Sequence, residues 1–116
     1  MNKVKAAALW TLQILLAALF VMSALAKLTS NPEMVERFRQ WGYPDNFYYL
    51  VGATELLGAI GLLIPRVAAY GASALMVIMV GASLTHLLHE ETSRVAFTGV
   101  IFLLLAGVAY ARRPAF

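Results

Sequence analysis

Four apolar stretches occupy most of this 116-residue chain and constrain its fold more than any other feature. We place them at residues 6–26, 47–64, 67–88 and 95–111. A bilayer core about 30 Å thick requires roughly 20 apolar residues per helix, with about 17–25 tolerated. Each stretch falls within that range. The sequence therefore predicts an all-α fold, an integral membrane four-helix bundle that forms one domain over residues 1–116.

The composition agrees with a chain that is solvated mainly by lipid. Apolar residues make up 61% and charged residues 13%, against about 45–50% and about 25% in typical globular domains. The net charge of +3 comes from scattered basic residues, so we expect no nucleic acid partner. The absence of cysteine excludes disulfides and thiolate-bound metals. The expected partners are the lipid bilayer and other membrane proteins, with a homo-oligomer left open.

The connection between the first two apolar stretches has a helical periodicity of its own. Pro32 favours the start of a helix and Gly42 favours its end. Between them Met34, Phe38 and Trp41 follow an i, i+4, i+7 spacing, while most other positions are charged. We expect a short amphipathic helix that lies on the membrane surface or forms a lid over the bundle. An ordered loop is the alternative.

The distribution of basic residues predicts the orientation. With both termini on one side, that side carries five basic residues and no acid, and the other side carries four basic residues. The five are Lys3, Lys5, Arg66, Arg112 and Arg113. The positive-inside rule then favours cytoplasmic N and C termini, in the cytoplasmic membrane.

The first apolar stretch also imitates a secretory signal peptide, with basic residues before it and an Ala24-x-Ala26 sequence at its end. The apolar core of a signal peptide is about 7–15 residues long. The run here is about 20 residues, which is the length of a membrane span. We therefore expect a retained transmembrane helix.

Three ionisable side chains fall inside the apolar stretches, where each costs about 2.5–3.5 kcal/mol unless it has a partner. Alternating topology places Lys27, Glu55 and His86 at one level of the membrane. We expect the charged atoms of Lys27 and Glu55 within about 4 Å of each other. His86 is then a hydrogen-bond partner or a titrating group at the accessible rim of the cluster. Ser23 lies on the stripe of Lys27, and Thr98 could complete the cluster from the fourth helix.

Other chemistry has weaker support in the sequence. His86 and His89 are spaced as two metal ligands could be, beside Glu90. Carboxylate-bridged metal bundles need several buried glutamates, and only Glu55 is available. We therefore expect no metal. Phosphate-binding loops and nucleophile motifs are absent from the sequence, and catalytic residues remain unknown.

At these residues the chain resembles the DoxX family over almost its whole length. Five features occur in the order that the family shows, although Ala24 stands where many members have glycine. They are the segment Phe20-Val-Met-Ser-Ala-Leu-Ala-Lys27-Leu, the Gly42-Tyr43-Pro44 turn, the Glu55-Leu-Leu-Gly58 run, Gly61 to Pro65, and His86.

The resemblance implies a small four-helix protein of the cytoplasmic membrane, in a family whose functions are diverse. Some members are linked to quinone-reducing membrane complexes, and distant relatives act as assembly chaperones. We expect an accessory or assembly protein with no catalytic activity of its own and no cofactor. The alternatives are a quinone-interacting subunit of a membrane oxidoreductase and a binder of small lipophilic ligands.

Overall fold

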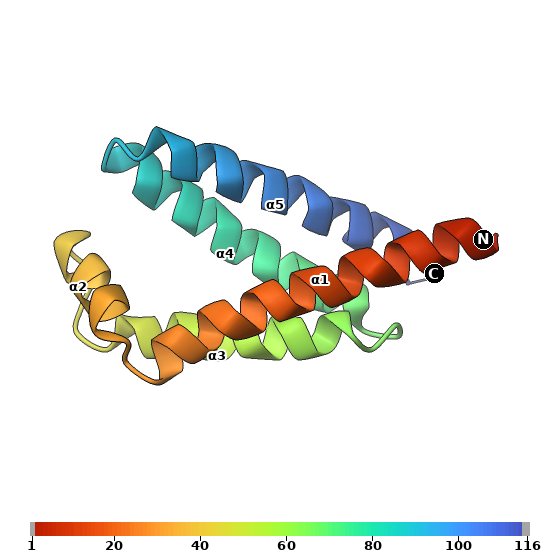
Figure 1. Ribbon diagram of the computed structural model, residues 1–116, viewed down its shortest axis with the longest axis horizontal. Helices are drawn as coiled ribbons and strands as arrows, with labels where there is room; N and C mark the ends of the chain where they lie inside the picture. The colour runs from red at the N-terminus through yellow and green to blue at the C-terminus, as the bar shows by residue number, and fades with distance from the viewer. Residues whose placement is uncertain (1, 115–116) are drawn as a thin grey trace.

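The computed structural model describes residues 2–114, and this part of the chain is helical without any strand. It contains five helices (Figure 1). Their bounds are Lys3–Leu28 for α1, Pro32–Gln40 for α2, Phe47–Leu62 for α3, Ala68–Leu88 for α4 and Thr92–Ala111 for α5. The predicted all-α class is confirmed.

One helix, α3, is shorter than the membrane span that the sequence predicts. By length and composition α1, α4 and α5 could each cross a membrane, whereas α3 is apolar but has only 16 residues. The helix predicted over 47–64 ends at Leu62 because Pro65 lacks an N–H and its ring clashes with the preceding helical turn. α1 and α5 each begin three residues before the predicted apolar stretch, since polar residues extend the helix beyond it.

The short amphipathic helix predicted after the first apolar stretch is present as α2. Asn31 caps it, with a side-chain oxygen that accepts hydrogen bonds from the backbone N–H groups of Glu33 and Met34. Pro32 occupies the first turn, where a missing N–H does no harm. The chain leaves the helix through Gly42, whose φ of +83° lies in the left-handed region that favours glycine.

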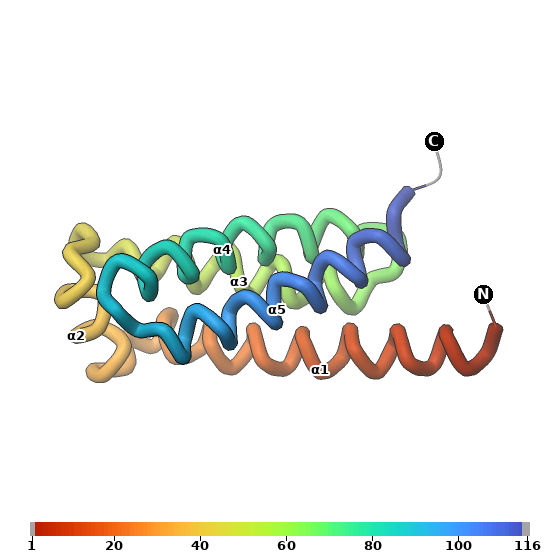
Figure 2. Tube along the Cα trace, turned by 90° about the horizontal axis from the view of Figure 1, so that it is seen from above, coloured from red at the N-terminus to blue at the C-terminus, as the bar shows by residue number. Residues whose placement is uncertain are grey.

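The four long helices pack as two pairs that diverge toward one end of the molecule. α1 packs against α3, α3 against α4 and α4 against α5, while α1 and α5 touch only sparsely. The start of α1 and the end of α5 lie at the same end, and α2 lies at the opposite end (Figures 1 and 2). Figure 1 shows the α1–α3 pair separating from the α4–α5 pair toward α2. We call the α2 end the open end and the other the closed end.

Glycines bring α3 and α4 into backbone contact near the closed end. A Cβ atom on Gly71 would lie 2.9 Å from the carbonyl oxygen of Gly58 and 3.1 Å from the carbonyl carbon of Gly61. Small residues allow this approach in membrane bundles, where packing replaces the hydrophobic effect as the cause of helix association. The α3–α4 pair is therefore joined tightly just where the chain turns between the two helices.

A buried amide also holds the closed end together. Gln13 is fully buried on α1, and its Nε2 donates a hydrogen bond of 2.6 Å to the backbone oxygen of Leu62. Its Oε1 accepts a 3.0 Å hydrogen bond from Nε of Arg112. Leu62 ends α3, so its carbonyl has no helical N–H to bind. Gln13 therefore links α1 to the ends of both α3 and α5.

The outer surface of the helices is apolar. Large side chains such as Met22, Leu57 and Leu103 are mostly exposed, whereas Leu75 and Leu105 are fully buried between the helices. An apolar surface of this extent is uncommon on soluble monomers and is typical of helices in contact with lipid.

Candidate functional site

A cavity of about 480 Å³ lies at the open end, and all five helices contribute to its lining. Its volume falls within the range of about 300–1,000 Å³ that is usual for small-molecule sites. The lining is mainly apolar, with the Lys27–Glu55 pair among its few polar groups. Val77 on α4 and Phe97 on α5 also line it although they are 70% and 56% exposed, so the cavity reaches the outer surface between the helices.

The ion pair predicted between Lys27 and Glu55 is confirmed. Nζ of Lys27 lies 2.8 Å from Oε1 of Glu55, and the two residues are 7% and 2% exposed. Close approach of α1 to α3 makes this possible, since a Cβ atom on Gly52 would lie 2.9 Å from Cβ of Lys27. The ammonium approaches Oε1 outside hydrogen-bond alignment, so this oxygen accepts no hydrogen bond within residues 2–114. The contact is therefore an ion pair held by charge.

Ser23 takes part in the same cluster, as the stripe on α1 predicted. Its Oγ accepts a 2.6 Å hydrogen bond from Nζ of Lys27, one turn away. An ammonium group carries three protons. Within the described residues Ser23 is its one hydrogen-bond acceptor, and both residues line the cavity. Lys27 can therefore donate a further hydrogen bond to a group inside the cavity.

His86 lines the same cavity but does not complete the Lys27–Glu55 pair. Its Nδ1 lies 2.9 Å from Oε1 of Glu91, at the start of α5. Because an ionised carboxylate can only accept, Nδ1 donates in this hydrogen bond. Trp41 packs edge-on against the imidazole ring, with 5.4 Å between the centroids. His86 is consequently only 8% exposed, against 7% for Lys27, which differs from the expected position at an accessible rim.

Thr98 lies on the α5 side of the cavity and is also buried. Its Oγ1 is 2.6 Å from Oγ of Ser83 on α4 and donates to backbone carbonyls within α5. Thr98 thus shares the cavity with Lys27 and Glu55 and makes no hydrogen bond with either. Thr98 therefore lies in the same cavity as the ion pair, as its position in the sequence predicted, but it does not complete the cluster by a hydrogen bond.

The apolar face of α2 covers the open end of the cavity. Met34, Phe38 and Trp41 all contribute to the lining. The buried ring of Phe38 lies 5.3 Å from the ring of Trp41 and 5.5 Å from the ring of Tyr43, centroid to centroid. Of the two positions expected for this helix, the packing corresponds to a lid over the bundle.

Four residues at the site were not identified from the sequence: Arg37, Tyr43, Glu91 and Arg94. Arg37 stands three residues after Met34, so it borders the apolar face of α2, and this spacing was a usable signal. Tyr43 stacks on Phe47 and bonds through its hydroxyl to Oγ1 of Thr85. Apart from their charge, nothing in the sequence around Glu91 and Arg94 indicated that they lie at the site.

Glu91 joins three elements at the open end. Its Oε1 accepts hydrogen bonds from Nδ1 of His86 on α4 and, at 3.2 Å, from Nε1 of Trp41 at the end of α2. Nε of Arg94 on α5 lies 3.9 Å from Oε2. The hydrogen bond from His86, and then the charges of His86 and Arg94, hold the pKa of Glu91 below its ordinary value of 4.5.

We expect this connection to fail in acid. A carboxyl with a depressed pKa contributes its full stabilisation above its ordinary pKa and loses it as the pH falls through the lowered value. As the pH falls below 4.5 and through the lowered pKa of Glu91, the indole N–H resonance of Trp41 should therefore shift as its acceptor is protonated. Trp10, near the closed end under Arg112, is the internal reference in the same NMR spectra. A Trp41 resonance that still moves with the same midpoint in Glu91→Gln would refute this assignment.

A family comparison places the chain among known proteins. The profile of the DoxX-like family matches residues 11–108, which run from the first half of α1 almost to the end of α5. No curated protein and no solved structure matches the chain significantly. With three helices long and apolar enough to cross a bilayer, the protein is a multi-pass integral membrane protein that belongs to the DoxX-like family.

Proposed function

We propose that this DoxX-family protein binds a small lipophilic molecule in the cavity at the open end. The observation that carries the proposal is the cavity itself, which is apolar, has the volume of a ligand site and contains the Lys27–Glu55 pair. An accessory or assembly role, which we expected first from the sequence, requires no such cavity. The cavity therefore favours ligand binding, with a quinone as one lipophilic candidate.

The proposal includes four membrane spans in one domain over residues 1–116. α3 is about 24 Å long, and the apolar residues 63–64 extend it at the closed end. If α3 spans the membrane, the chain crosses it four times and ends on the side where it began. This agrees with the start of α1 and the end of α5 lying at the same end of the molecule. That end carries basic and no acidic residues, which supports cytoplasmic termini in the cytoplasmic membrane.

In this arrangement the cavity lies within one leaflet. Openings beside Val77 and Phe97 would admit a ligand laterally from the lipid, and α2 would cover the cavity toward the aqueous side. The buried charges of Lys27 and Glu55 would orient the polar part of the ligand, because electrostatic interactions are stronger in an apolar pocket of low dielectric constant than in water. Binding and orientation require no residue to act as a nucleophile or base.

Filling part of the cavity should weaken binding. Gly81 lines the cavity and a Cβ atom there meets nothing within 4 Å, so Gly81→Phe is expected to add a ring at the cavity. In a Trp10→Phe background Trp41 is the one remaining tryptophan, and it lines the cavity too. We expect a decyl-substituted benzoquinone to quench Trp41 fluorescence saturably in phosphatidylcholine nanodiscs. Gly81→Phe should weaken that quenching by at least about tenfold.

The matched control is Gly99→Phe. Gly99 on α5 likewise has open space around its Cβ position but does not line the cavity. This variant should bind the quinone as the parent protein does. 1-Dodecanol should relieve the quenching by competition if the site accepts lipophilic molecules generally. Quenching that never saturates, or that Gly81→Phe leaves unchanged, would reject the cavity as a ligand site.

A further inference from the structure

We propose that the cavity selects amphiphiles with an anionic head group, a carboxylate or a phosphate, and that Arg37 and Arg94 bind that group. This inference rests on the proposed function and names the ligand class for the same site. It depends on the charge balance of the lining, on the free hydrogen-bonding capacity of two guanidinium groups and on where those groups point.

The lining carries an excess of positive charge. Three permanently or ordinarily cationic side chains, Lys27, Arg37 and Arg94, face one carboxylate, that of Glu55. These four side chains alone carry three positive charges and one negative charge, a sum of +2. Glu55 is already matched by Lys27 at 2.8 Å, so within the lining the excess charge belongs to the two arginines, whose neighbouring carboxylates, Glu33 at 3.1 Å and Glu91 at 3.9 Å, lie outside it. Positive charge gathered at the mouth of a mainly apolar cavity attracts an anion, and the arginine side chains there are 36% and 40% exposed, so an incoming head group can reach them.

Both arginines have unused donors. A guanidinium has five N–H groups. Arg37 uses one of its terminal nitrogens on Oε1 of Glu33, at 3.1 Å, and that carboxylate is exposed on α2. The distance of 3.9 Å between Arg94 and Glu91 is too long for a hydrogen bond, and within residues 2–114 Arg94 donates no side-chain hydrogen bond. Most of ten N–H groups therefore remain for a ligand.

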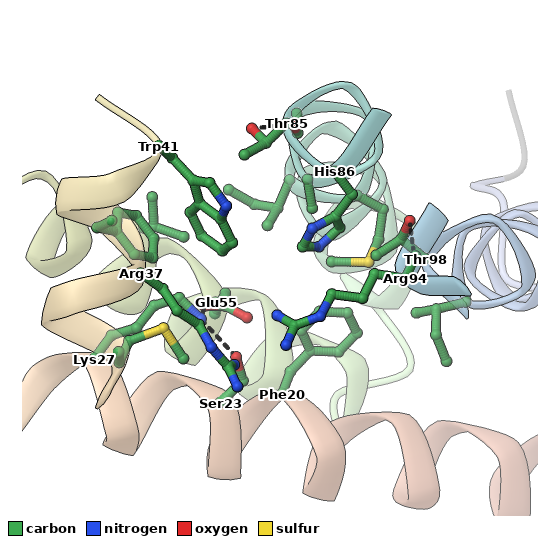
Figure 3. A pocket seen from close by; sticks show the side chains of 18 of the residues that line it. Phe20, Ser23, Lys27, Arg37, Trp41, Glu55, Thr85, His86, Arg94 and Thr98 are labelled. Carbon is green, nitrogen blue, oxygen red and sulfur yellow. Dashed lines mark hydrogen bonds and ion pairs between the residues drawn. The ribbon is translucent and has the colours of Figure 1, made fainter. Parts of the chain in front are cut away.

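The two guanidinium groups reach into the cavity from different elements. Figure 3 shows Arg37 extending from α2 and Arg94 from α5 toward the space between the helices, with Phe20 near Arg94 and with Lys27, Ser23 and Glu55 near Arg37 in this view. A planar carboxylate or a phosphate matches the fork of an arginine with two parallel hydrogen bonds. A head group held between the two arginines would also lie on the side of the cavity from which Lys27 can donate.

The remainder of the lining suits a single hydrocarbon chain. Below the arginines it consists of apolar side chains, among them Phe20, Ile78, Met79 and Ile101. A head group between α2 and α5 would leave its chain among these residues, or directed through the openings beside Val77 and Phe97 into the bilayer. The site thus combines an anion-binding end under α2 with an apolar body.

Three probes of equal chain length test the inference: dodecanoate, dodecyl phosphate and 1-dodecanol. Each competes with the decyl-substituted benzoquinone for Trp41 quenching in phosphatidylcholine nanodiscs. We expect both anions to bind at least about tenfold more tightly than the alcohol, as charge-assisted hydrogen bonds require. Combined Arg37→Gln and Arg94→Gln substitutions should remove that preference and leave dodecanol binding unchanged.

Arg39→Gln is the matched control. Arg39 belongs to the same short helix and carries the same charge, but it is exposed, bonds to Glu36 and does not line the cavity. It should retain the full preference for anions. An equal loss of preference in Arg39→Gln would mean general attraction to a basic surface and would overturn the inference. Circular dichroism of each variant confirms that the helices are intact.

Failure of the inference differs from failure of the proposed function. If dodecanol and dodecanoate compete equally and the double arginine variant changes neither, the cavity binds lipophiles without charge selection and only the inference is wrong. If no probe competes and quinone quenching does not saturate, both proposals are wrong. Exchange of the nanodisc lipid for phosphatidylglycerol identifies the source of the anion. Reduced dodecanoate binding there assigns the site to a bilayer phospholipid, and unchanged binding assigns it to a free single-chain anion.

Discussion

Lys27→Met is expected to lower the free energy of unfolding by about 3–5 kcal/mol, because it leaves the carboxylate of Glu55 buried without a counter-charge. Glu55 is 2% exposed and its Oε1 has no other polar partner in the described chain, so no neighbouring group can compensate. Glu55→Leu should cost a similar amount by isolating the ammonium of Lys27. Equilibrium unfolding in mixed detergent and dodecyl sulfate micelles measures both effects.

The double variant Lys27→Met with Glu55→Leu should lose less free energy of unfolding than the sum of the losses in the two single variants. Replacing both charges by apolar groups removes the cost of desolvating them as well. Lys3→Met is the control: this lysine is exposed at the start of α1, and its loss should change stability by less than about 0.5 kcal/mol. Strict additivity of the two buried substitutions would show that the ion pair contributes no coupling energy.

Gly71→Val is expected to destabilise the protein by about 1–3 kcal/mol or more, by forcing α3 and α4 apart at the closed end. The atoms that a Cβ would meet, at 2.9–3.1 Å, belong to the backbone of residues 58–62 and cannot turn aside as a flexible side chain could. The displaced helices would also change the cavity, because both α3 and α4 contribute to its lining. Unfolding and Trp41 quenching by the benzoquinone should both respond.

Gly107→Val provides the comparison. Gly107 lies on α5, where a Cβ atom meets nothing within 4 Å, so the same added side chain should be tolerated there. β-Branched residues are also common in membrane helices and cost little in propensity. If Gly71→Val unfolds at the same denaturant concentration as Gly107→Val, the α3–α4 contact is looser than the distances indicate.

The sequence predicted the helical elements well because the cause of each is local. Apolar runs of membrane length, Pro32 and Gly42 around a short amphipathic segment, and Pro65 after a long one each act within a few residues of chain. Boundaries were off by two to three residues where polar residues continue a helix past its apolar part, as at Lys3 and Thr92.

The Lys27–Glu55 pair was also predictable, because two opposite charges at one membrane level have few other partners. The arrangement around His86 was not. Glu91 accepts its hydrogen bond and Trp41 covers its ring, and both come from connections whose course no periodicity specifies.

The amino-acid sequence by itself thus determined that the protein lies in a lipid bilayer, where its helices run and which charges pair inside it. These properties follow from hydropathy, helical period and the cost of charge in lipid. The tertiary structure alone decided the cavity and its character. The cavity lies where the two helix pairs separate, at the end opposite the backbone contact at Gly71. Likewise, whether Arg37 and Arg94 face solvent or a common space depends on how α2 packs across the bundle, and no local pattern encodes that packing.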